Sequence, residues 1–309
     1  MALSVLGGPS NVVWMRLAKV LGAIGRTMIT AGVLILLFVA YQLWGTGILQ
    51  ARAQHRLGKQ FDQQLATTTT TTTAPPGTTP PSTAPPLEQA PDEGTPIGRI
   101  EIDRIGLKAV VIEGVSDDDL KDGPGHYPST PMPGQKGNAA IAGHRTTYGA
   151  PFASIDELQV GDKISVTTLQ GHFTYEVIPQ ADGGPNLVVS PSHVEVLDDA
   201  GDNRLTLTAC HPKYSASQRI IVSAKLVGEP VVTPPTTPHA PIVAGLGGKR
   251  ASGVPAFLWA LVCAAIWIAA WRVGKVWRKW PSYIIGLPIF LVALFFFFEN
   301  FSRLLPSNY

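Results

Sequence analysis

Residues 205–212 read LTLTACHP, and this stretch decides how the central part of the chain folds. Leucine and threonine alternate up to residue 208, which is the pattern of a β-strand with one buried face. Cys210 follows near the end of this strand, because Pro212 cannot donate to a hydrogen-bonded ladder. Functional side chains often lie at such strand ends, held by a rigid element. A lone cysteine is also commonly a small buried apolar residue, so Cys210 by itself leaves both interpretations open.

The stretch lies within a β-rich segment, residues 95–229, which is long enough for one hydrophobic core. Strands are predicted at 99–105, 109–112, 139–142, 163–168, 172–178, 187–189, 204–208 and 219–226. Residues 169–171 (LQG) indicate a hairpin, and among the longer segments only 152–158 looks helical. Seven or eight short strands favour a closed or nearly closed β-barrel, although periodicity alone does not exclude a sandwich.

Two polar residues stand at the ends of neighbouring predicted strands. Arg219 begins the strand after Cys210, so a loop between antiparallel strands would bring the two together. An arginine there could bind an oxyanion, or it could be an ordinary surface residue. Residues 137–145 (GNAAIAGHR) end a short apolar strand at His144, which could donate and accept protons. His211 is discounted as the partner because adjacent strand residues point to opposite faces.

Three apolar segments are predicted to span a membrane: 28–49, 254–271 and 282–299. Basic residues precede the first, and the loop at 272–281 contains four cations, so both regions are expected on the cytoplasmic side. The N-terminal residues 1–27 are then cytoplasmic and the β-rich domain is extracellular. Two alternatives are a cleaved signal peptide at 51–53 (ARA) and a hairpin buried in a soluble core.

Two linkers flank the domain. Residues 50–94 are rich in Thr and Pro and are expected to form an extracellular stalk, while 230–253 form a second linker and 300–309 a tail. The chain has two cysteines, and Cys263 lies inside an apolar segment, so no disulfide with Cys210 is expected. No carboxylate cluster has the spacing of metal ligands, and no metal site is predicted.

Several of these stretches resemble the sortase family. Residues 206–210 (TLTAC) resemble the sortase signature TLxTC, and His144 and Arg219 occur where sortases carry their histidine and arginine. The runs at 123–128 (GPGHYP), 132–138 (MPGQKGN) and 143–152 (GHRTTYGAPF) are most similar to class E sortases of actinobacteria.

The resemblance implies an eight-stranded sortase-type β-barrel in a membrane-anchored cysteine transpeptidase. Cys210 would cleave an LAxTG- or LPxTG-like sorting motif of exported proteins between Thr and Gly through a thioester, with His144 as general acid and base and Arg219 as oxyanion ligand. The acyl group would pass to an amine of a cell-wall precursor resembling lipid II. Tyr127, Thr208 and Ala209 are the implied substrate-binding residues. No cofactor is implied, and no nucleic-acid partner is predicted.

Residue 209 departs from the signature, because alanine replaces its threonine. A threonine there could hydrogen-bond the substrate, and its loss would remove about 1 kcal/mol. This departure supports one alternative, a catalytically silent tethered domain that binds wall proteins. Another alternative, an L,D-transpeptidase, would carry His and Cys close together in an HGC-like run, and that run is absent.

Overall fold

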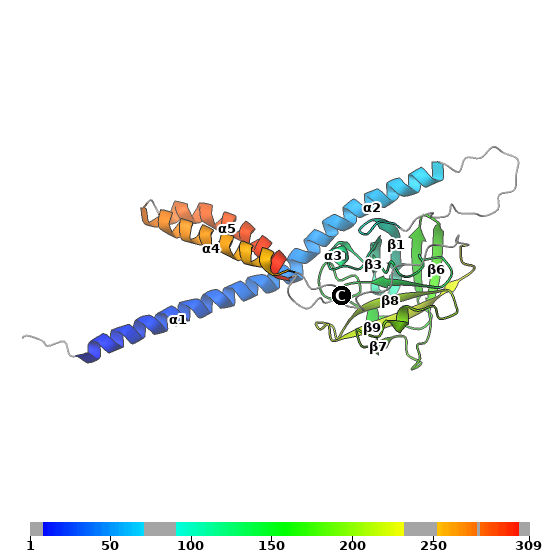
Figure 1. Ribbon diagram of the computed structural model, residues 1–309, viewed down its shortest axis with the longest axis horizontal. Coiled ribbons are helices and arrows are strands. Elements are labelled where there is room, and N and C mark those ends of the chain that lie inside the picture. Colours follow the sequence, from blue (N-terminus) through cyan, green and yellow to red (C-terminus); the bar gives the residue numbers. More distant parts are fainter. Residues whose placement is uncertain (1–8, 71–90, 232–251, 277–278, 303–309) are drawn as a thin grey trace, which may run out of the picture. The chain divides into compact units, whose positions relative to one another are not determined.

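The computed structural model describes residues 9–70, 91–231, 252–276 and 279–302 (Figure 1). The chain divides into two compact units between Trp44 and Gly45, and each is described by itself. Residues 71–90 of the predicted stalk and residues 232–251 of the second linker lie outside the described residues.

The first unit consists largely of an apolar helix, α1. Helix α1 covers Pro9–Ala40, and a π-helical turn at Tyr41–Gly45 leads from it into α2, Thr46–Thr70.

The C-terminal helices are α4, Val254–Val276, and α5, Lys279–Ser302. Within the described residues, three helical segments are long and apolar enough to cross a membrane: 17–67, 254–276 and 281–302. Each contains one predicted span, which confirms one N-terminal and two C-terminal apolar helices.

Helix α2 corrects the predicted stalk. Residues 50–70 are helical, so the expectation that a Thr/Pro-rich stalk starts at residue 50 is wrong for this stretch. Ala53, Leu57 and Phe61 recur every four residues and are buried. This spacing makes an apolar stripe along one face of a helix, and the stripe packs on the barrel instead of facing water.

Nine strands form one sheet in the order β6-β5-β1-β2-β3-β4-β8-β9-β7 (Figure 1). Their bounds are β1 Pro96–Ile102, β2 Leu107–Glu113, β3 Gly125–His126, β4 Asn138–Ala142, β5 Lys163–Thr168, β6 Gly171–Val177, β7 Leu187–Val189, β8 Arg204–His211 and β9 Gln218–Val227. Strand β6 also pairs with β9, so eight strands close into a ring and β7 pairs with a further part of β9. The predicted eight-stranded barrel is therefore confirmed.

Most strands lie where the sequence pattern predicts them. Strands β5 and β6 pair up to Thr168 and Gly171, as the hairpin signal at 169–171 indicates. The predicted helix at 152–158 is only a 3-10 turn, Ile155–Glu157. Strand β3 and the short helix α3, Asp119–Asp122, have no counterpart in the prediction, because two- and four-residue elements carry no readable period.

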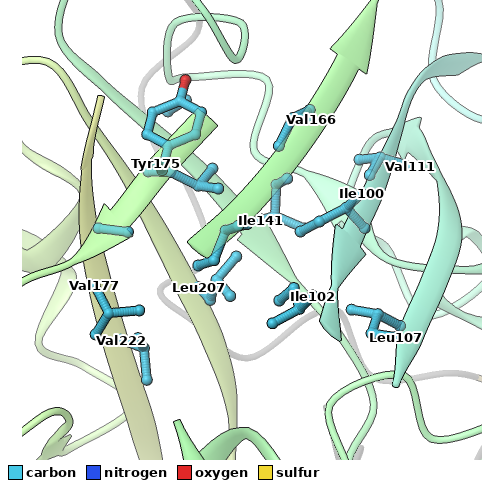
Figure 2. Close-up of a cluster of buried hydrophobic side chains, with 14 of the residues drawn as sticks. Ile100, Ile102, Leu107, Val111, Ile141, Val166, Tyr175, Val177, Leu207 and Val222 are labelled. Atoms are coloured by element: carbon cyan, nitrogen blue, oxygen red, sulfur yellow. The ribbon is translucent and has the colours of Figure 1, made fainter. Parts of the chain in front are cut away.

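The barrel interior is filled by alternate residues of every long strand. Figure 2 shows Ile100 and Ile102 of β1 facing Leu207 of β8 and Val222 of β9 across the interior. Because side chains on a strand alternate between faces, the residues between these point outward. The inward set of β8 is Leu205, Leu207 and Ala209, which leaves Thr206, Thr208 and Cys210 on the outer face.

Helix α2 is fixed to the outside of the barrel by apolar and polar contacts. Leu57 packs with Val110 and Ile112 of β2. Gln54 Nε2 donates to the carbonyls of Val110 and Asp122 at 3.0 and 2.8 Å, and Gln54 Oε1 accepts the Val110 N–H at 2.7 Å. One glutamine thus satisfies three backbone groups of the barrel domain, so α2 is held in one register against it.

The C-terminal helices pack against each other through aromatic rings. Trp259 of α4 stacks on Phe296 of α5 with ring centroids 4.8 Å apart, and Trp267 lies 5.9 Å from Phe290. The predicted bounds of these spans differ from the helices by a few residues, because the helices continue into the basic loop expected at 272–281.

Candidate active site

Strand β8 places Cys210 on the outer face of the barrel near the end of the strand. Its side chain points away from the core that Leu207 and Ala209 enter, yet Cys210 is only 2% exposed. A second cluster lies on the outer face of the neighbouring strand β4, where Leu120, Tyr127 and Leu197 pack on Ala140 and Ala142. Cys210 is therefore buried although it points away from the barrel core.

Strand β9 brings Arg219 next to Cys210. The two residues are register partners in the antiparallel pair of β8 and β9, so their side chains share the outer face. Arg219 is buried, and its Nη1 donates to the carbonyls of Ala216 and Gln218 at 3.1 and 3.0 Å. The expected proximity of Cys210 and Arg219 is observed, and the guanidinium is oriented by the loop between the strands.

Strand β4 brings His144 to the other side of Cys210. Ala142 pairs with Thr208 in the parallel pair of β4 and β8, and the Gly143 N–H donates to the Thr208 carbonyl at 3.1 Å. His144 follows the last residue of β4 by two positions, so it lies just past the end of the strand that pairs with β8 on the side opposite β9. Thr147 Oγ1 lies 3.5 Å from His144 Nδ1.

Gly143 is needed for this turn of the chain. A Cβ there would lie 2.6 Å from the ring of Phe152. The backbone before His144 therefore packs directly on a buried aromatic ring. Of the three predicted catalytic residues, Cys210 and Arg219 are paired on β8 and β9, and His144 follows the end of β4, the other neighbour of β8.

Tyr127 and Thr208 lie together next to this group. The Tyr127 hydroxyl is 3.3 Å from Thr208 Oγ1, and both residues are buried on the outer face of β8. Burial raises the pKa of Tyr127, although the hydrogen bond with Thr208 and the charge of Arg219 oppose this. The phenol is thus neutral and can donate a hydrogen bond.

A buried group of hydrogen bonds supports the backbone beside Tyr127. His126 Nδ1 is 2.8 Å from Glu113 Oε2, and its Nε2 is 2.9 Å from the Pro131 carbonyl. Thr130 Oγ1 donates to the Tyr127 carbonyl at 2.9 Å and accepts the Ala140 N–H. His126 is therefore tied into the structure that holds Tyr127.

Ala209 does not lie in the site, which corrects its predicted substrate-binding role. Its side chain is fully buried in the barrel core and pairs across the sheet with Ile220. The residue before an outward-facing cysteine in a strand must face inward, because the side-chain period is two. A substrate on the face of Cys210 can reach only the backbone of Ala209.

Arg145 is a site residue that the sequence reasoning missed. It is 2% exposed, and its Nη2 pairs with Asp156 Oδ1 at 2.6 Å. Its Nη1 lies 3.4 Å from the Cys210 carbonyl and 3.3 Å from His211 Nδ1. Arg145 ties the residue after His144 to the end of β8. The sequence feature that could have indicated Arg145 is its position directly after His144, at the end of a short apolar strand.

Electrostatics around Cys210 favour the neutral thiol. Burial raises the pKa of Cys210 from 9.0 to about 11, against the opposing charges of Arg219 and Arg145. At neutral pH the side chain is a thiol, and its proton must leave when the sulfur attacks an acyl group. A side chain that accepts the thiol proton is therefore required. His144, which follows the strand paired with β8, is the candidate for this role.

Cys210 pairs with Arg219 on β9, and His144 follows the end of β4 on the other side of β8, a set of residues with the composition of a cysteine acyl-transfer site. Comparison with known proteins identifies the family. Residues 100–227 match the sortase domain. The chain belongs to the sortase family and is most similar to its class E members.

The relatives include two sortases of Streptomyces coelicolor. Sortase SrtE1 is 35% identical over 225 residues, which is 67% of this chain and 57% of that protein. The match thus spans little more than half the length of SrtE1. Sortase SrtE2 is 28% identical over 238 residues, covering 72% of this chain and 87% of that protein.

Solved structures with similarity include sortase E from Streptomyces avermitilis and a sortase D5 transpeptidase from Clostridium perfringens. The first is 38% identical over 45% of this chain and 93% of its own, with a TM-score of 0.39. The second is 32% identical over 57% of this chain and 99% of its own, with a TM-score of 0.46.

Proposed function

We propose that this protein is a membrane-anchored cysteine transpeptidase that cleaves a sorting motif and transfers the acyl group to an amine. The observation that supports this most directly is the register of three strands. Cys210 pairs with Arg219 on one side, and the pairing of β4 with β8 leads to His144 on the other. Membership of the sortase family supports the same reaction class.

The first half-reaction forms a thioester. The Cys210 sulfur attacks the carbonyl carbon of the motif threonine, and its proton passes to His144. The carbonyl oxygen becomes an oxyanion, which the Arg219 guanidinium stabilises. When the C–N bond breaks, the imidazolium of His144 protonates the leaving glycine amine, and the acyl group remains on sulfur.

The second half-reaction runs in the opposite direction with a new amine. An amine of a cell-wall precursor resembling lipid II attacks the thioester carbon and gives a proton to His144. The thiolate leaves and is protonated again, so Cys210 returns as a thiol and a new amide is formed. Splitting one amide exchange into two acyl transfers lowers the barrier of each step.

The substrate is proposed to be an exported protein with an LAxTG- or LPxTG-like motif near its C-terminus. Tyr127 and Thr208 are the proposed substrate-binding side chains. Their hydroxyls lie 3.3 Å apart beside Cys210, where a phenol and an alcohol can bind a peptide backbone. Class E similarity favours the alanine-containing motif.

The catalytic domain is proposed to face the cell exterior on a multi-pass membrane protein. Arg16, Lys19 and Arg26 precede the first apolar segment, and four cations lie between residues 272 and 279. By the positive-inside rule both regions are cytoplasmic, which sets the barrel on the opposite side of the membrane. Labelling of single engineered cysteines in intact cells tests this orientation.

The decisive experiment is cleavage of a fluorogenic Leu-Ala-x-Thr-Gly peptide by the full chain in detergent micelles. Wild type is expected to release the glycine fragment and to carry an acyl mass on Cys210 after acid quench. Cys210→Ala and His144→Ala are expected to lose both signals. Binding of the peptide without cleavage by wild type would favour the catalytically silent domain instead.

A further inference from the structure

Helix α2 reaches the loop that follows His144. The ring of Tyr148 lies 5.2 Å from the His144 ring, with 35° between the two planes. Thr147 Oγ1 lies 3.5 Å from His144 Nδ1. Residues 147 and 148 therefore contact the imidazole on the side away from β4. We propose that Tyr148 is a positioning residue for His144 and that helix α2 holds its loop in place.

The backbone of Tyr148 needs outside support. Its φ is 49°, in the left-handed region that a bulky side chain rarely adopts, and Ala150 has a φ of 44°. Such conformations persist only where the surroundings determine them. Tyr148 is also 6% exposed, so its backbone groups need partners within the protein.

The first residue of α2 supplies that support. The Tyr148 N–H donates to Thr46 Oγ1 at 3.1 Å, a buried hydrogen bond between residues 102 positions apart. Thr46 is 1% exposed. The Thr46 hydroxyl therefore accepts the backbone N–H of Tyr148, the residue in the left-handed conformation.

The next turn of α2 packs on the neighbouring residue of the loop. Gly149 has a φ of 71°, and a Cβ on it would lie 2.4 Å from Gln50 Oε1. The amide of Gln50 thus lies directly over the loop backbone. Thr46 and Gln50 are one helical turn apart and contact consecutive loop residues.

Helix α2 can act as a support because it is anchored elsewhere. Leu57 and Phe61 are buried, and Gln54 bonds three backbone groups of the barrel domain. A hydroxyl carried by a fixed helix holds its partner more firmly than one carried by a loop. The first turn of α2, at Thr46 and Gln50, therefore supports the loop that follows His144.

This inference rests on the proposed role of His144 in proton transfer. The test measures peptide cleavage by the full chain in detergent micelles, with rates divided by the amount of reactive Cys210 thiol. Thr46→Val keeps the shape but removes the acceptor, and Thr46→Ser restores it. Tyr148→Leu removes the ring, whereas Tyr148→Phe retains it. Gln60→Ala, at an exposed position of α2, is the matched control.

Thr46→Val is expected to lower kcat roughly three- to tenfold, the factor that one lost hydrogen bond gives, with KM within about twofold. Tyr148→Leu is expected to lower kcat at least as much and to shift the limb of the pH profile that belongs to His144. Thr46→Ser, Tyr148→Phe and Gln60→Ala are expected to stay within about twofold of wild type.

Two results would overturn the inference. Equal kcat for Thr46→Val and wild type would show that α2 does not position the histidine. A loss in Thr46→Val that Thr46→Ser does not restore, with an unchanged pH profile, would show a merely structural contact. Failure of the proposed function is distinguishable, because then wild type would not cleave the peptide, or Cys210→Ala and His144→Ala would cleave it as wild type does.

Discussion

The buried thiol of Cys210 predicts an unusual pH dependence of its alkylation. The pKa of Cys210 is raised by burial to about 11, compared with 9.0 for an ordinary thiol. This difference corresponds to about 3 kcal/mol that disfavours the thiolate in the folded protein. At pH 8 the folded thiol should therefore react about 100-fold more slowly than the same thiol in unfolded chain.

The assay is iodoacetamide labelling of Cys210 followed by mass spectrometry, in a Cys263→Ala background that leaves one thiol. The labelling rate is expected to rise tenfold per pH unit from pH 7 to pH 10 and to level off near pH 11. Limited access lowers the rate at every pH, but it leaves the midpoint unchanged. The midpoint therefore reports the ionisation alone.

Arg219→Gln provides the matched perturbation. Removing a positive charge beside the thiolate removes a stabilising interaction, so labelling at pH 9 should slow roughly tenfold or more. Arg204→Gln is the control, because Arg204 pairs with Asp202 at the opposite end of β8. A midpoint at or below pH 8 in the wild type would refute the reasoning, since it would mean that the arginines outweigh burial.

Three further changes test other parts of the structure. Glu113→Gln should lower the free energy of unfolding by about 1–3 kcal/mol in urea titrations, because the buried 2.8 Å hydrogen bond between Glu113 Oε2 and His126 Nδ1 is weakened or lost; an unchanged midpoint would contradict this. Leu57→Ala should reduce the free energy that holds α2 on the barrel by about 2–5 kcal/mol, so backbone amides along α2 should exchange faster with solvent. Unaltered exchange would show that α2 stays on the barrel without the Leu57 side chain. The hydrogen bond from Arg204 lowers the pKa of Asp202 below its ordinary value of 3.8. The pair therefore stabilises the folded protein above pH 3.8, and this stabilisation is lost as the pH falls through the lowered pKa of Asp202. Asp202→Asn should therefore cost about 1 kcal/mol or less at pH 6 and almost nothing at pH 2, and an equal cost at both would contradict the assignment.

Strands and spans were predictable because their signals are local. Alternation in residues 163–168 and the turn at 169–171 specify a hairpin without help from distant residues. The three apolar segments are readable by length alone. Cys210, His144 and Arg219 were recognisable because each stands at a strand end in a family motif.

Other features were predicted wrongly because they depend on packing. Ala209 was placed in the site from its position beside Cys210, but strand alternation sends its side chain into the core. The first part of the expected stalk is helical because Leu57 and Phe61 find an apolar surface on the barrel. The polar composition of residues 50–70 did not indicate a helix that packs on the barrel. Packing of only three buried side chains, Ala53, Leu57 and Phe61, stabilises it.

The sequence by itself determined a β-rich domain between apolar helices and a cysteine, a histidine and an arginine at strand ends. These follow from periodicity, hydrophobic length and motif, all of which are properties of neighbouring residues. Only the tertiary structure decided that β4 and β9 flank the strand of Cys210, that Arg145 is buried beside the Cys210 carbonyl, and that Thr46 bonds the loop of Tyr148. The last two contacts join residues 65 and 102 positions apart, and barrel closure and helix docking, not local pattern, bring such residues together.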